Sequence, residues 1–239
     1  MPESTPEDAV EGTVSDVESV GAIASPEFIA SLLADGDDDL AAWAIGQALA
    51  EQSRAVVFDD VIRRAMELVG ARWVTGQWSI SQEHLATVAL MDALARLRPR
   101  DPSETRIGPI AVLAAPEGEQ HVTGLACLAQ ILEERGWRAQ NLGANVPADD
   151  LQRFVAGHEV QLVALSIGTR DRLPALRRTV EVLRSGGAGG AGRRVPIMVG
   201  GHGTEGVEAE IQDADLVTPS LAEAERFIVD LGERLRRQD

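Results

Sequence analysis

The stretch Ile110-Ala111-Val112-Leu113-Ala114-Ala115 is an apolar run, and Glu119-Gln120-His121-Val122-Thr123-Gly124 follows it after a short loop. A short continuous apolar run is typical of a strand that is buried on both faces of a parallel sheet. The histidine would then lie in the first strand-to-helix loop, where such sheets bind ligands. A neutral imidazole is a good ligand for a transition metal, and a nearby carboxylate can orient it. His121 is therefore a candidate metal ligand, with Glu119 as its orienting partner.

Downstream of this run, strand patterns and helix patterns alternate along the chain. We expect strands at 108–115, 138–142, 161–166, 195–199 and 214–217, and helices near 121–135, 147–156, 171–185, 204–211 and 220–236. Regular alternation predicts a doubly wound parallel sheet of five strands, flavodoxin-like (Rossmann-like), with helices on both faces. The glycine-rich segment 186–192 is expected to be a flexible loop before the fourth strand.

Upstream of the run, residues from about 26 to 98 have a helical pattern. Helix starts are expected at Pro26, after Asp37-Asp38-Asp39, after Ser53, and after Ser79 or Ser81. Four helices with short connections predict a small bundle, so the fold class is α/β with an N-terminal all-α part, a four-helix bundle. Residues 1–24 are acidic, lack basic residues and have no apolar period, which predicts a disordered tail. The expected domains are the tail 1–24, the bundle 25–99 and the sheet domain 106–239.

The composition excludes several classes of partner. The net charge is −16 at pH 7 and all 22 basic residues are arginine, so nucleic acid and anionic membranes are poor partners. No apolar stretch is long enough to span a membrane, and the start of the chain does not resemble a signal peptide. The single cysteine, Cys127, cannot form an internal disulfide and is expected to be a buried small residue. We therefore expect a cytoplasmic protein.

Small and polar residues follow three further predicted strands, at Ser166-Ile167-Gly168, Gly200-Gly201 and Thr218. Because the carboxyl ends of parallel strands meet at one edge, these loops would line a crevice together with His121. Glycine lets the backbone approach a bulky ligand closely. The segment 201–206 also matches a dinucleotide fingerprint, but it follows the fourth strand instead of the first, so we set it aside.

In this order, Glu119-x-His121-x-x-Gly124, Ser166 and Gly200-Gly201 resemble the Asp-x-His-x-x-Gly, Ser and Gly-Gly motifs of the cobalamin-binding domain of methionine synthase and the cobalamin mutases. The resemblance covers roughly residues 106–236. It implies that His121 is the lower axial cobalt ligand and Glu119 its orienting partner. Two positions depart from the pattern, because Glu119 replaces an aspartate and Gly168 replaces a leucine or threonine, which we expect to widen the tunnel for the nucleotide tail. The implied cofactor-binding residues of this domain are Glu119, His121, Val122, Gly124, Ser166, Gly168, Gly200, Gly201 and Thr218.

Trp73 and Glu83-His84 stand in the predicted bundle with a spacing that resembles the Trp-x9-Glu-His motif of the CarH/LitR-type cobalamin photoreceptors. In that class the tryptophan lies over the upper cobalt ligand and the glutamate binds the adenosyl group. The resemblance implies adenosylcobalamin as cofactor, with Trp73, Glu83 and His84 in the part that caps its upper face. On the residues alone, Trp73 would be a core aromatic and Glu83-His84 a polar first helical turn. The other tryptophans, Trp43, Trp78 and Trp137, are expected to pack.

The resemblance also has limits. CarH-type repressors carry an N-terminal DNA-binding domain that we do not expect in this chain, and Val74 stands where some of them have a second histidine. The resemblance is therefore to stand-alone photoreceptors, among which photocobilins also bind a bilin, so biliverdin is a second candidate cofactor. We expect a non-enzymatic, homo-oligomeric light sensor that signals to a downstream protein. The alternatives are a corrinoid methyl-carrier protein of a methyltransferase system and a flavodoxin-like module for another ligand.

Overall fold

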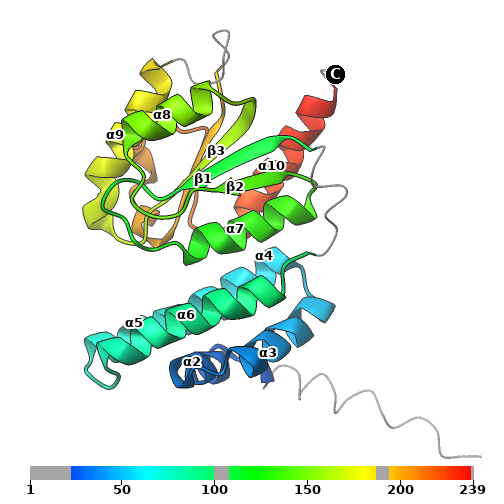
Figure 1. Cartoon of the computed structure of the whole chain (residues 1–239), viewed down its shortest axis with the longest axis vertical. Coiled ribbons are helices and arrows are strands. Elements are labelled where there is room, and N and C mark those ends of the chain that lie inside the picture. Colours follow the sequence, from blue (N-terminus) through cyan, green and yellow to red (C-terminus); the bar gives the residue numbers. More distant parts are fainter. Residues whose placement is uncertain (1–22, 100–107, 187–193, 238–239) are drawn as a thin grey trace, which may run out of the picture. The chain divides into compact units, whose positions relative to one another are not determined.

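The computed structural model describes residues 23–99, 108–186 and 194–237 and divides into two compact units, Met1–Leu97 and Arg98–Asp239 (Figure 1). Nearly all of the predicted acidic tail and most of the predicted glycine-rich loop lie outside the described residues.

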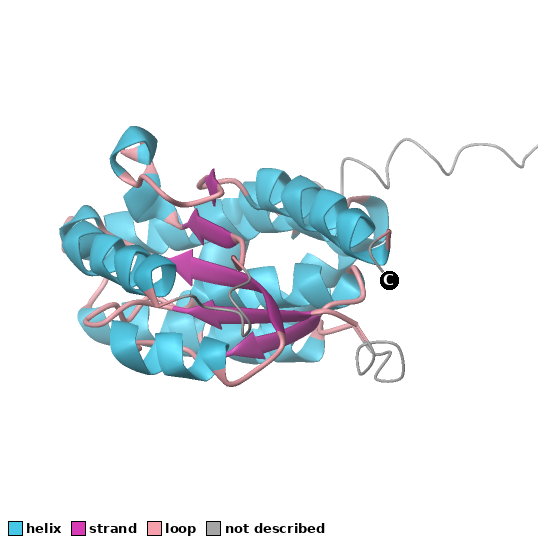
Figure 2. Ribbon diagram, turned by 90° about the horizontal axis from the view of Figure 1, so that it is seen from above, coloured by secondary structure: helices cyan, strands magenta, loops and turns pink. Residues whose placement is uncertain are grey.

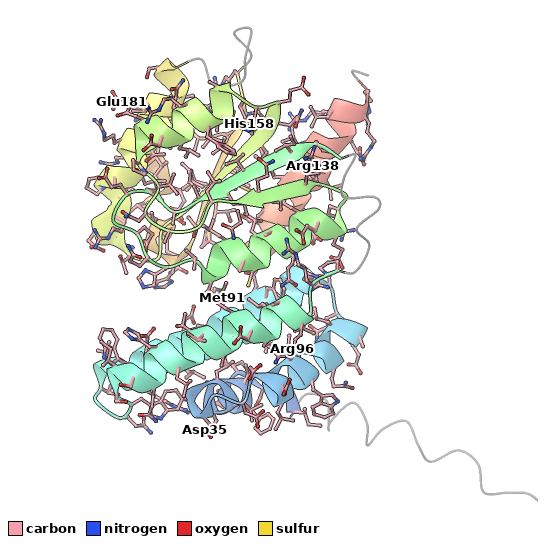
Figure 3. The ribbon with its side chains drawn as sticks, in the orientation of Figure 1. Asp35, Met91, Arg96, Arg138, His158 and Glu181 are labelled. Carbon is pink, nitrogen blue, oxygen red and sulfur yellow. The ribbon has the colours of Figure 1, made fainter. Side chains whose placement is uncertain are left out.

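The helical unit contains helices α2 (Pro26–Asp35), α3 (Asp38–Glu51), α4 (Arg54–Val57), α5 (Arg64–Val74) and α6 (Ile80–Arg96). Each predicted start is confirmed by a capping side chain, because Ser25, Asp37, Ser53 and Ser79 accept hydrogen bonds from the first turns of α2, α3, α4 and α6. Arg96, labelled in Figure 3, lies in the last turn of α6. It pairs with Asp39 at the start of α3, 3.0 Å away. The core of the unit contains Ile29, Leu33, Ile45, Phe58, Ile62, Leu90 and Leu94.

One long helix of this unit contains a π-helical turn. The segments α4, η1 (Phe58–Arg63) and α5 follow one another without a break, and η1 has the wider i→i+5 hydrogen bonding. Phe58 and Ile62 in this π turn are both buried, and α2 is a neighbouring helix in contact with the turn. The sequence pattern predicts the helix, and the π turn is an addition to that prediction.

The sheet unit contains five parallel strands in the order β2-β1-β3-β4-β5. The strands are β1 (Ile110–Ala114), β2 (Arg138–Asn141), β3 (Val160–Ser166), β4 (Ile197–Gly200) and β5 (Leu216–Val217). The helices are α7 (Thr123–Glu134), α8 (Ala148–Ala156), α9 (Leu173–Ser185) and α10 (Leu221–Arg236). Helices α7 and α10 cover one face and α8 and α9 cover the other, as Figure 2 shows. This is the doubly wound flavodoxin-like order, so the predicted fold class is confirmed.

The helix predicted at 204–211 is wrong. The chain there makes two 3-10 turns, η3 (His202–Thr204) and η4 (Glu208–Glu210), joined by an irregular segment. Gly206 has a φ of +71° and Gly201 a φ of +95°, and neither value is compatible with a right-handed α-helix. The segment therefore stays a loop at the carboxyl edge of the sheet.

Candidate functional site

The loop between β1 and α7 holds His121 and Glu119 in direct contact. One oxygen of Glu119, Oε1, accepts hydrogen bonds from the backbone N–H of His121 at 2.8 Å and from its ring Nδ1 at 2.6 Å. Because Nδ1 faces the carboxylate, a metal would bind the imidazole through Nε2. The glutamate is 1% exposed whereas the side chain of His121 is 65% exposed. The loop thus presents an oriented imidazole outward on a buried carboxylate.

The second oxygen of Glu119 reaches a different strand loop. Its Oε2 accepts from the backbone N–H of Gly168, just after β3, at 2.7 Å. Burial raises the pKa of this carboxyl, but the hydrogen bonds from His121 and Gly168 outweigh it and lower the pKa from 4.5 to about 2. Glu119 therefore stays ionised and joins the loops after β1 and β3.

Gly168 leaves room for the histidine ring. A Cβ atom at this position would lie 2.5–2.8 Å from atoms of the His121 side chain, which is closer than real Cβ contacts come. Glycine in place of leucine or threonine at position 168 is predicted to widen the tunnel. In the structure, the space that a larger side chain would take is instead occupied by the imidazole of His121. A side chain at this position would force His121 into a different orientation.

The hydroxyl of Ser166, the last residue of β3, lies between two glycines. The Cβ positions of Gly124 and Gly201 are 3.5 Å and 2.8 Å from its Oγ. Ser166 is 8% exposed, and no hydrogen bond of its hydroxyl occurs within the described residues. The hydroxyl is not among the fully buried polar atoms that lack a partner, so it stays accessible to a ligand or to water. This part of the site therefore suits a ligand that carries hydrogen-bonding groups into the sheet unit.

The loops after β4 and β5 lie directly against each other. A Cβ at Gly200 would be 3.1 Å from the carbonyl oxygen of Thr218. The buried Thr218 hydroxyl donates to Glu223 at 2.6 Å and accepts from the N–H of Ser220 at 3.1 Å, which fixes the start of α10. Next to Gly201, the exposed His202 lies 3.5 Å from Glu205. The structure brings together the predicted residues that follow β1, β3 and β4. Thr218 lies beside them at the end of β5, and Val122 is the N-cap residue of α7.

The three predicted residues of the helical unit lie at the hairpin between α5 and α6. Trp73 comes four residues after the fully buried Val69 but is itself 45% exposed. Glu83 comes three residues before the fully buried Ala86; it accepts from Thr87 at 3.3 Å and lies 3.4 Å from the exposed His84. Trp73 and Glu83 therefore extend the buried stripes of their helices into solvent, and the core reading of Trp73 is wrong.

The remaining tryptophans differ from one another. Trp137 is 1% exposed and packs against α10, and Trp78 stacks under Arg72 with the guanidinium carbon 4.5 Å from the ring centre. Trp43 on α3 is 49% exposed, so its predicted packing is wrong. Cys127 is buried on α7, as the composition predicts.

The donor set constrains the kind of metal. Across residues 23–99, 108–186 and 194–237, no group of three or more His, Cys, Asp or Glu side chains gathers to hold an ion. A single imidazole with one orienting carboxylate suits a metal that brings its other ligands with it, as a metal in a macrocycle does. Also within these ranges, no helix has the length and apolar character needed to cross a membrane.

Comparison with known proteins points to one cofactor. Residues 109–227 match a family described as B12 binding domain, and residues 27–98 match a second family with the same description. The chain is 35% identical over 126 residues to the HTH-type transcriptional repressor CarA and 32% identical over 158 residues to the repressor CarH, both of Myxococcus xanthus. These matches cover 52% and 66% of this chain but 41% and 50% of the repressors, so the chain spans half of their length or less.

Corrinoid proteins of Methanosarcina barkeri are also similar. The dimethylamine corrinoid protein is 22% identical over 183 residues, 75% of this chain and 84% of that protein. The solved monomethylamine corrinoid protein superposes with a TM-score of 0.70 at 18% identity, covering 88% of this chain and 98% of that one. At this identity the second likeness shows a shared fold, a helical part followed by a five-stranded parallel sheet.

Proposed function

We propose that this chain, a cobalamin-binding protein, is a light sensor that carries adenosylcobalamin. The proposal rests on Trp73, a large aromatic side chain left 45% exposed at the end of an otherwise buried stripe. Exposure of so much apolar surface is costly, and a ligand that covers the ring would remove the cost. Glu83, on the next helix, supplies a carboxylate that hydroxyl groups of a nucleoside can bind.

The residues of the sheet unit fit a cobalamin held from below. His121 would bind the cobalt, and Glu119 fixes which of its ring nitrogens does so. The hydroxyl of Ser166 would bind the nucleotide tail, and the small residues Gly124 and Gly201 would leave room for it. Val122, Gly168, Gly200 and Thr218 would contribute to the walls of the same site.

Bound adenosylcobalamin would supply a cobalt–carbon bond that visible light breaks. Trp73 would shield the upper ligand, Glu83, beside His84, would bind it, and the imidazole of His121 would hold the cobalt. Breakage of that bond would remove the contacts of Trp73 and Glu83 with the departing group, whereas His121 would keep its own contact. Such a difference in contacts shifts the population of conformations and so the oligomeric state or the binding of a downstream protein.

The similarity to CarH supports this reading, although it covers half of that protein. DNA binding is not part of the proposal, because the chain carries a net charge of −16. Biliverdin is a second candidate chromophore.

The test uses the whole chain, loaded in the dark with adenosylcobalamin, with and without biliverdin. Spectra and size-exclusion profiles are recorded before and after green illumination, beside a sample kept dark. We expect both the spectrum and the elution volume or hydrogen-exchange protection to change. Because free adenosylcobalamin also photolyses, a spectral change with no change in the protein would contradict the proposal. A biliverdin arm with no bound bilin spectrum would remove that chromophore alone.

The second candidate is a corrinoid carrier protein, and the similarity along 84% of the dimethylamine corrinoid protein favours it. A carrier needs an upper face that is open to a partner enzyme, whereas a sensor needs it covered. A competition experiment that measures whether the protein retains methylcobalamin or adenosylcobalamin distinguishes a carrier from a sensor. Preferential retention of the methyl form, with no light response of the protein, would support the carrier.

A further inference from the structure

The loop that holds Glu119 is anchored to the loop after β2. Strands β1 and β2 continue to pair beyond their ends, because Ala115 N–H donates to Gly143 O and Val146 N–H donates to Ala115 O, both at 2.9 Å. Pro116 and Val146 form an isolated parallel bridge. This pairing carries the segment 143–146 alongside the loop that leads to the histidine.

Asn145 makes the last two links of this pairing. Its side-chain Oδ1 accepts from the N–H of Gly118 at 2.7 Å, and its own backbone N–H donates to the carbonyl oxygen of Glu119 at 2.9 Å. The residue thus binds the backbone on both sides of the Gly118–Glu119 peptide. To do so it adopts a left-handed conformation, with a φ of 56° that asparagine tolerates better than most residues.

Glu119 is therefore held from two directions. The loop after β3 binds its side chain through Gly168, and the loop after β2 binds its backbone through Asn145. The carboxylate in turn sets the orientation of His121. A shift of the Glu119 backbone would move the carboxylate away from Nδ1, and the imidazole would lose its fixed direction.

We infer that Asn145 is a positioning residue for the axial histidine, acting through Glu119. The inference rests on the proposed role of His121 as cobalt ligand. Groups that orient a metal ligand are typically worth about 10- to 100-fold in affinity. Loss of the Asn145 side chain is expected to act on the cobalt ligation itself and not only on folding.

Three substitutions separate the two properties of Asn145. Asn145→Gly keeps the left-handed backbone and removes the acceptor, Asn145→Ala removes the acceptor and strains the backbone, and Asn145→Asp keeps both. Asp213 has a φ of 70° and lies ahead of β5, so Asp213→Gly is a matched control for deleting a side chain at a left-handed position.

Each protein is loaded with adenosylcobalamin in the dark, and two quantities are measured: affinity, and the fraction of imidazole-ligated spectrum at saturation. For Asn145→Gly we expect about 10-fold weaker binding or more and partial conversion to the base-off spectrum, with Asn145→Asp and Asp213→Gly close to the parent. A purely structural role would lower the melting temperature of the cofactor-free protein without changing the saturated spectrum, and that result overturns the inference.

His121→Ala provides the reference. If it loses the imidazole-ligated spectrum while Asn145→Gly matches the parent, the assignment of Asn145 alone is overturned. If His121→Ala keeps the parent spectrum, the axial role of His121 fails and the inference fails with it.

Discussion

At the scale of single residues, Glu119 is the most constrained group of the site. Its two oxygens accept three hydrogen bonds while the side chain is almost fully buried. An amide in its place would turn one acceptor into a donor that faces other donors. The orientation of His121 therefore depends on a carboxylate that is charged.

Glu119→Gln tests this dependence. We expect cobalamin to bind about 10- to 100-fold more weakly, because the imidazole loses its orienting partner. Glu117→Gln, an exposed residue two positions earlier in the same loop, is the matched control and should bind like the parent. Titration followed by absorbance gives both affinities, and equal values for the two variants would refute the role of Glu119.

Gly201 combines a left-handed backbone with a lack of space. At a φ of +95°, its Cβ would lie 2.2 Å from the carbonyl oxygen of Ile167 and 2.8 Å from Ser166 Oγ. Gly201→Ala should therefore cost more than the roughly 1–2 kcal/mol of left-handed strain. Gly136→Ala, at a φ of +78° with nothing within 4 Å of the Cβ position, is the control for a positive φ without a clash in the same unit. Denaturant unfolding that finds equal losses for the two variants would contradict the clash.

At the scale of elements, the start of α6 determines where Glu83 and His84 lie. Ser79 and Gln82 form a reciprocal capping box, with Ser79 N–H donating to Gln82 Oε1 at 2.9 Å and Gln82 N–H donating to Ser79 Oγ at 3.3 Å. The cap fixes the first turn of α6, which contains Glu83.

Ser79→Ala should therefore destabilise the helical unit by about 1 kcal/mol and fray the turn that carries Glu83. Ser81→Ala, an exposed serine in the same first turn, is the control and should change stability little. Circular dichroism during urea unfolding measures both. A loss for Ser81→Ala as large as that for Ser79→Ala would argue against the capping box.

The elements also show what a single sequence can predict. Sequence patterns identify all five strands within a few residues. In β1 and β3, burial on both faces leaves a plain apolar signal, whereas β2 and β5 at the sheet edges are only partly buried. The helix predicted at 204–211 fails because its pattern does not reveal the left-handed φ of Gly206. The π turn escapes prediction, since the apolar stripe around it still reads as an ordinary helix.

In the candidate site, too, some residues can be predicted from the sequence and others cannot. The motif identifies Glu119 and His121, and their contact is confirmed at 2.6 Å. The fit of Gly168 to the imidazole depends on a side-chain orientation that no spacing encodes. Asn145 is missed because it meets Gly118 only through the pairing of two loops that are far apart in sequence. The cofactor roles of all these residues stay predictions.

At the scale of the whole molecule, the sensor reading depends on residues of both units acting on one cofactor. Trp73→Ala should leave cobalamin bound through His121 but remove the shield of the upper ligand. We expect faster loss of the adenosyl group in light and a smaller light-dependent change in size. Trp43→Ala is the matched control, because Trp43 lies in the same unit and its exposed fraction, 49%, is close to the 45% of Trp73. Identical photolysis and elution profiles for the two variants would remove the main support for the sensor.

The π turn in the long helix affects which changes of chain length the helical unit can survive. In a regular α-helix, deletion of one residue rotates everything beyond it by about 100°. Such a deletion in α5 would turn Trp73 away from the stripe that Ala65 and Val69 define. Within Phe58–Arg63 the same deletion would convert the wide turn into an α-helical one and keep both flanks in phase. The helix thus contains one place where a residue can be lost with its two ends still facing the same way.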